Sequence, residues 1–131
     1  MTRKLSLEKR SGLAMVEMAL VLPVLLLLAI GVMDYGMQFY VLHLMSDAAR
    51  DAAREAAVRS GTVAQAQAVA ASDLSGMPGH FTITVVQPVV GASNQDVTVT
   101  ISVPVSDVAL GFFAASGQKL QTGITMRKES G

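Results

Sequence analysis

One carboxylate lies inside a long apolar run, and it is the side chain whose type and position most suggest chemistry. Glu17 is the single charged residue between Leu13 and Met33. An unpaired carboxylate among lipid tails is unfavourable, so an ionisable residue in a membrane-spanning segment is a candidate functional residue. Gly12 lies five residues before it, and a glycine lets an enzyme's active site approach the backbone closely. Gly12 and Glu17 are therefore the first candidates for function.

Other kinds of chemistry find little support in the composition. The 131 residues include no Cys and two His, which excludes thiol catalysis, a disulfide framework and an ordinary zinc site. No glycine-rich phosphate loop occurs, and neither histidine has a recognisable nucleophile partner. Ten Lys and Arg balance ten Asp and Glu, so a whole-chain basic field for nucleic acid is absent. We expect a protein that is not an enzyme, with no catalytic residues, no metal, no cofactor, no nucleic acid and no small-molecule substrate.

The apolar run itself is long enough to cross a membrane. The chain is 51% hydrophobic and 15% charged, whereas charged residues make up about a quarter of an average soluble domain. At 1.5 Å per residue, a helix over 13–33 covers roughly 30 Å, the thickness of a bilayer core. A chain this short has too little other structure to bury a helix that is apolar on every side. The sequence therefore predicts a membrane-spanning helix.

The residues before the run set its orientation. Residues 1–12 carry four basic side chains and one acidic side chain, which keeps this end in the cytoplasm. In a bacterium the protein would cross the inner membrane once, with its C-terminal domain in the periplasm or at the cell surface. Three fates remain open for the segment: a permanent anchor, a secretory signal cut after Gly31, or a prepilin-type signal cut after Gly12.

A family resemblance favours the third fate. Gly12-Leu13-Ala14-Met15-Val16-Glu17 resembles the type IV prepilin processing site, in which the glutamate becomes the fifth mature residue. Residues 11–40 resemble the TadE-like proteins of tight-adherence pilus systems. Met18 departs from the aromatic residue that commonly follows the glutamate. The positions that align are Glu17, Ala19, Leu20, Pro23, Asp34, Gly36 and Tyr40.

The resemblance implies a non-catalytic minor pilin, pseudopilin or pilus-assembly component, involved in surface adhesion and biofilm formation. A prepilin peptidase would cut between Gly12 and Leu13, leaving six basic and nine acidic side chains and a net charge of −3. The new α-amino group of Leu13 would pair with Glu17 of an adjacent subunit. Pro23 would either ease extraction of the helix into a filament or serve only in packing. The implied partners are the membrane, the prepilin peptidase, other pilins and pilus-assembly proteins.

Beyond the membrane, residues 34–72 are predicted to form an exported, amphipathic, alanine-rich helix. Three aromatic residues near its start, Tyr35, Phe39 and Tyr40, are suited to the membrane interface. Gly61 is a natural helix stop, and the sequence leaves open whether the helix continues or restarts over 62–72.

Residues 73–131 read as a small antiparallel β module. Apolar and polar residues alternate over 81–86, 97–103 and 120–126, which predicts three strands, with a fourth possible. The alanine-rich helix is the element available to cover their apolar face. The predicted fold class is α+β and pilin-like. In the 105–117 connection, Leu110, Phe112 and Phe113 either fold under the sheet or form an exposed patch.

The predicted organisation is a leader at 1–12, a transmembrane helix at 13–33, an exported helix at 34–72 and the β module at 73–131. An alternative is a signal-anchored envelope protein with a small exported binding or scaffolding domain. A further alternative is a small secreted β domain or enzyme released after Gly31.

Overall fold

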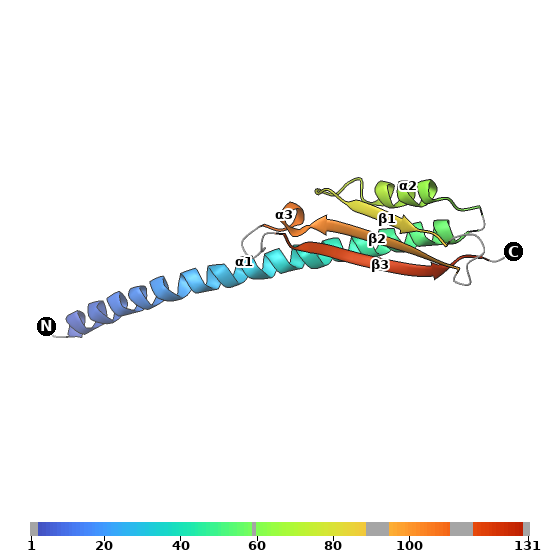
Figure 1. Cartoon of the computed structure of the whole chain (residues 1–131). Helices are drawn as coiled ribbons and strands as arrows, with labels where there is room; N and C mark the ends of the chain where they lie inside the picture. The colour runs from blue at the N-terminus through green and yellow to red at the C-terminus, as the bar shows by residue number, and fades with distance from the viewer. Residues whose placement is uncertain (1–2, 59, 89–94, 111–116, 130–131) are drawn as a thin grey trace. The chain divides into compact units, whose positions relative to one another are not determined.

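The computed structural model describes residues 3–58, 60–88, 95–110 and 117–129, with side chains from residue 12 onward. The elements in chain order are α1 (Arg3–Ala57), α2 (Val63–Asp73), β1 (Thr82–Val86), β2 (Asp96–Pro104), α3 (Val105–Val108) and β3 (Lys119–Arg127) (Figure 1). The chain divides into two compact units, Met1–Met33 and Asp34–Gly131. Phe112 and Phe113 lie outside the described residues.

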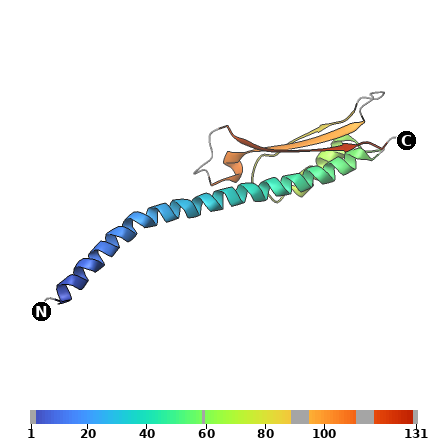
Figure 2. The same cartoon turned by 90° about the horizontal axis from the view of Figure 1, so that it is seen from below.

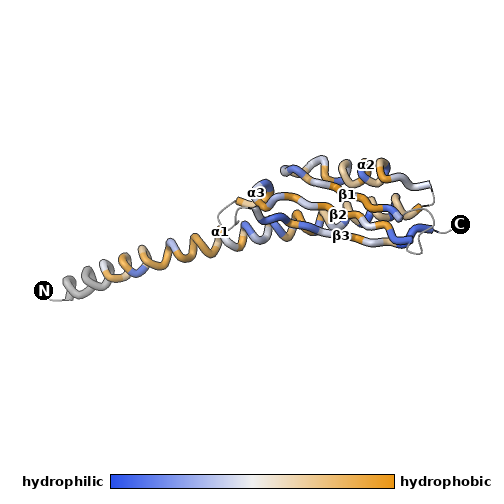
Figure 3. The backbone as a smooth tube through the Cα atoms, viewed as in Figure 1, coloured by the Kyte–Doolittle hydropathy of each residue, from blue (hydrophilic) through white to orange (hydrophobic). Residues whose placement is uncertain are grey.

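The first unit is the N-terminal part of α1. Its side chains from Leu13 to Leu28 are all exposed, and Figure 3 shows this stretch as almost continuously hydrophobic. The most apolar window of α1 has a mean hydropathy of 2.7, and none of that window is buried by the protein. Among the described residues this is the one helix long and apolar enough to cross a membrane. A long apolar helix with no protein covering it indicates a membrane anchor.

The second unit is built on a three-stranded antiparallel sheet of order β1-β2-β3. The register places Ile83 opposite Ile101 between β1 and β2, and Val99 opposite Ile124 between β2 and β3. Because successive side chains on a strand point to opposite faces, this register gathers the apolar residues of all three strands on one face. The period-two pattern of the sequence is thereby confirmed as a sheet with one apolar face.

The C-terminal half of α1 covers that face (Figure 2). Its buried residues recur at helical spacing and include five alanines that are at most 2% exposed. The side chain of alanine is a single methyl group, which is too small to hold the helix away from the sheet. The two layers can therefore approach closely. The buried apolar residues that form this core are Val41, Met45, Ala48, Ala49, Ala52, Ala53 and Ala56 of α1, and Val97, Val99, Ile101 and Val103 of β2.

The helix restarts beyond Gly61 instead of continuing. Gly61 donates its backbone N–H to the carbonyl of Val58, and a Cβ added there would collide with the backbone oxygen of Glu55. Thr62 then caps α2: its hydroxyl accepts the N–H of Gln65, whose side-chain oxygen accepts the Thr62 N–H. This reciprocal capping box fixes the start of a new helix.

α2 and α3 complete the domain around the sheet. α2 lies along β1 and adds Ala66 and Ala70 to the core (Figure 1). The single turn of α3 follows β2 directly and buries Val105 and Val108. The long N-terminal apolar helix and the three-stranded antiparallel sheet confirm the predicted α+β fold class.

Candidate processing and assembly site

Gly12, Leu13 and Glu17 lie close together on α1, and no side chain that the structure describes covers them. A Cβ at Gly12 would meet no atom within 4 Å, and Leu13 is 71% exposed. Leu13 and Glu17 are four residues apart and therefore share a helix face. Glu17 is exposed and makes no hydrogen bond or ion pair with any described residue. The structure thus brings these three residues together and leaves them accessible to another molecule.

Pro23 lies apart from them. It is six positions beyond Glu17, so the two side chains do not share a face of a helix with 3.6 residues per turn. α1 continues through Pro23 without a break, although a proline has no N–H to donate to the carbonyl four residues earlier, that of Ala19. The N-terminal half of α1 is curved (Figure 2). Pro23 is therefore a local feature of the helix backbone and not part of the Gly12–Glu17 group.

Asp34 is a second, buried carboxyl group, at the start of the second unit. Its side chain is fully buried, and its Oδ1 accepts the backbone N–H of Leu110 at 2.7 Å. Its Oδ2 is also buried and has no hydrogen-bond partner within the described part of the chain. Burying a polar group is unfavourable unless it is hydrogen-bonded. The bond therefore ties Leu110, two residues after α3, to Asp34 at the start of the domain.

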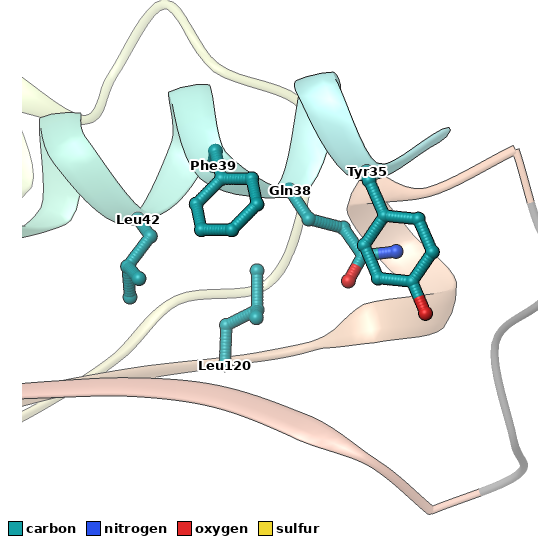
Figure 4. Close-up of a pocket in the computed structure, with 5 residues that line it drawn as sticks. All are labelled: Tyr35, Gln38, Phe39, Leu42 and Leu120. Atoms are coloured by element: carbon teal, nitrogen blue, oxygen red, sulfur yellow. The ribbon is translucent and has the colours of Figure 1, made fainter. Parts of the chain in front are cut away.

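An apolar pocket of about 150 Å³ lies next to this point. Figure 4 shows side chains of α1 facing Leu120 of β3 across the pocket. The helix side chains that line it are Tyr35, Gln38, Phe39 and Leu42. Tyr35 and Phe39 are 57% and 68% exposed, so large aromatic surfaces border the pocket without being buried by it.

A histidine and an aspartate meet at the surface of the domain. His80 Nδ1 lies 3.0 Å from Asp107 Oδ2, and the His80 backbone N–H donates to the same oxygen at 3.1 Å. These two hydrogen bonds lower the pKa of Asp107 below its ordinary value of 3.8. Ser106 donates its hydroxyl to Asp107 Oδ1, so it does not approach His80 as a nucleophile would. Within the described residues, the arrangement ties the loop before β1 to α3 without forming a catalytic triad.

In the sequence, Asp34 is noted only as a position that aligns with the TadE-like proteins. Its burial and its hydrogen bond to Leu110 were missed. A signal was present, since Asp34 is the single Asp, Glu, Lys or Arg between Glu17 and Asp47. Its partner, Leu110, is 76 residues away, and no sequence pattern connects the two. The pair of His80 and Asp107, 27 residues apart, was missed for the same reason.

The uncovered apolar N-terminal helix indicates a membrane anchor, and the second unit packs a helix under a small antiparallel sheet; together they define the class of membrane-anchored α+β proteins. The sequence model of the TadE-like protein family matches residues 12–54. This segment is about a third of the chain, and over it the resemblance to the TadE-like proteins predicted from the sequence is confirmed. The family indicates a role in tight-adherence pilus assembly, and its pilus components are generally non-enzymatic. No curated protein and no solved structure gives a significant match.

Proposed function

We propose that the chain is a non-catalytic minor pilin or assembly component of a tight-adherence pilus, processed by a prepilin peptidase after Gly12. The observation that carries the proposal is the family match, which begins at Gly12 and includes Leu13, Glu17 and Pro23. The protein acts through subunit contacts during pilus biogenesis, and through the pilus in surface adhesion and biofilm formation. It is held in the inner membrane by residues 13–33, with its N-terminus cytoplasmic and its domain exported.

The exposure of the processing site supports cleavage. Gly12 has no neighbour within 4 Å of a Cβ position, and Leu13 is 71% exposed. Other pilins and pilus-assembly proteins would contact the same uncovered stretch once it is processed. Cleavage would place a new α-amino group on Leu13, and such a group with an ordinary pKa near 8 is largely protonated at neutral pH.

Glu17 is the residue to which we assign subunit pairing. In the processed chain it lies near the N-terminus of α1, where the helix dipole favours a negative charge. It has no partner among the described residues, and a carboxylate in an apolar environment is stabilised by a cation. The α-amino group of Leu13 in a neighbouring subunit supplies that cation and sets the axial register. Pro23 assists by leaving one carbonyl of α1 without its helical bond, which lowers the resistance of the helix to bending during extraction.

Processing is tested by replacing Gly12 with leucine. Gly12→Leu should abolish cleavage, so that the membrane fraction of the host contains only the unprocessed mass. Gly36→Leu is the matched control, because Gly36 also lies in α1, is exposed and has no atom near a Cβ position. Cleavage of Gly12→Leu at the wild-type site would contradict the assignment of Gly12.

The role of Glu17 is tested by Glu17→Gln, which keeps the shape of the side chain and removes its charge. We expect normal membrane insertion and processing, with loss of pili from the cell surface by electron microscopy. Asp51→Asn removes an exposed carboxylate elsewhere on α1 and should leave pili unchanged. Wild-type numbers of pili in Glu17→Gln would overturn the pairing role.

A further inference from the structure

Several large apolar side chains are exposed where the domain begins. Tyr35, Met37, Phe39 and Tyr40 follow one another within six residues of α1 and are between 47% and 68% exposed. Leu110 is 60% exposed and is bonded through its backbone to Asp34. We call these five side chains the exit face; those of α1 lie around the helix and not on a single side of it. An exposed apolar cluster of this kind marks an interaction surface.

Leu110 is the most informative residue of the exit face, because it is the one that does not belong to α1. The domain buries Asp34 completely and uses its Oδ1 to hold the Leu110 N–H at 2.7 Å. Despite that anchoring, the leucine side chain is not buried in the core, and apolar surface in water is unfavourable. The contact therefore holds an exposed leucine at the level of Asp34, one residue beyond the apolar segment 13–33.

That level corresponds to the surface of a bilayer. The headgroup layers add roughly 5–8 Å on each side of the hydrocarbon core. At 1.5 Å per residue, Tyr35 lies about 3 Å along α1 beyond Met33, within this layer, and Phe39 lies about 9 Å beyond it, just outside. Side chains on a helix lean toward its N-terminus, which brings the Phe39 ring back to the headgroup layer. Tyrosine and phenylalanine carry large apolar rings, and tyrosine also has the polar tip that suits the interface.

The charge distribution fits the same placement. Residues 35–46 contain no Asp, Glu, Lys or Arg, so α1 brings no formal charge to the interface until Asp47. Asp34, the acidic residue just before this stretch of α1, is buried by the domain. Tyr35 and Phe39 also line the apolar pocket, together with Leu120.

We propose that the exit face docks the exported domain onto the bilayer, with Leu110 and the aromatic rings inserted at the boundary between headgroups and acyl chains. Asp34 acts as the positioning residue that presents Leu110 to the lipid. The proposal rests on membrane anchoring by residues 13–33 and does not depend on cleavage or on pilus assembly.

The absence of Trp from the sequence allows a direct test with single tryptophans in the full-length protein. Leu110→Trp and Phe39→Trp report on the exit face. Leu26→Trp lies in the apolar segment and is the positive control, and Val86→Trp, on the exposed side of β1, is the matched surface control. Each variant is reconstituted in phosphatidylcholine vesicles, with or without lipid brominated on the upper part of one acyl chain, and tryptophan fluorescence is measured.

We expect the fluorescence of Leu110→Trp and Phe39→Trp to be quenched by brominated lipid and shifted to shorter wavelength, as for Leu26→Trp. Val86→Trp should keep its intensity. If Leu26→Trp is quenched but Leu110→Trp behaves like Val86→Trp, docking is refuted while anchoring stands. If Leu26→Trp itself is not quenched, anchoring fails and docking fails with it.

The role of Asp34 is tested in the Leu110→Trp background. Asp34→Ala removes the acceptor and should lose the quenching, whereas Asp34→Asn keeps an oxygen that accepts the Leu110 N–H and should retain it. Asp34→Ala combined with Phe39→Trp checks that the domain still lies at the membrane, and its quenching should persist. Full quenching of Leu110→Trp in the Asp34→Ala background would overturn the positioning role.

Discussion

Asp34→Ala should loosen the chain at Leu110, just after α3, while leaving the rest of the domain folded. The substitution deletes the acceptor at 2.7 Å from the Leu110 N–H and leaves that partly buried donor unsatisfied. A buried polar group without its partner costs about 1–3 kcal/mol. Since 1.4 kcal/mol corresponds to a tenfold change in an equilibrium, local opening around Leu110 should become about 5- to 150-fold more frequent.

Amide hydrogen exchange measures that opening directly, because a protected amide exchanges through local opening of its hydrogen bond. In full-length protein in detergent micelles, the Leu110 amide should exchange faster by this factor in Asp34→Ala. Asp34→Asn, which retains an acceptor oxygen, should change the rate by less than about fivefold. Asp51→Ala, on the exposed side of α1, is the control. Unchanged exchange at Leu110 in Asp34→Ala would refute the assignment of Asp34 as the group that holds this segment.

Three further predictions concern the domain that begins at Asp34. Gly61→Ala should destabilise it by about 1–3 kcal/mol, because the added Cβ collides with a backbone oxygen of α1. Gly76→Ala is the control: a Cβ at Gly76 would meet no atom within 4 Å, so this substitution should not lower the midpoint of thermal unfolding. Ile101→Ala, which empties a fully buried position in the central strand, should cost about 2–5 kcal/mol in denaturant unfolding, and a smaller loss would mean that the core is loosely packed. The lowered pKa of Asp107 stabilises the fold above the ordinary pKa of 3.8, and this contribution is lost as pH falls through the folded value. An NMR titration should place the Asp107 midpoint below 3.8 and return it toward that value in His80→Ala; the same midpoint in both proteins would show that His80 is not the cause of the lowered pKa.

The parts of the fold that follow from local periodicity could be predicted. The apolar run from Leu13 to Met33 and the alternation on the three strands each depend on one physical preference repeated many times. The alanine-rich helix was predicted to cover the apolar face of the strands, and its alanines are buried against the sheet. The restart at α2 was left open, although Thr62 and Gln65 have the spacing of a capping box.

Features that depend on contacts between distant residues could not be predicted from the sequence. The sequence leaves open whether Leu110 is buried or exposed; in the structure it is exposed, and its backbone is bonded to Asp34 at the start of the domain. The pocket likewise requires Leu120 of β3 to meet α1 at Phe39. The processing site is of another kind, since Gly12, Leu13 and Glu17 are neighbours on one helix and their proximity follows from the sequence alone.

The central claim is that a prepilin peptidase releases the first twelve residues. It is tested most directly by determining the N-terminal sequence and intact mass of the protein isolated from membranes of its native host. We predict a chain that begins at Leu13. A chain that retains Met1 would indicate a permanent signal anchor, one that begins at Val32 would indicate a conventional secretory signal, and either result would contradict release by a prepilin peptidase.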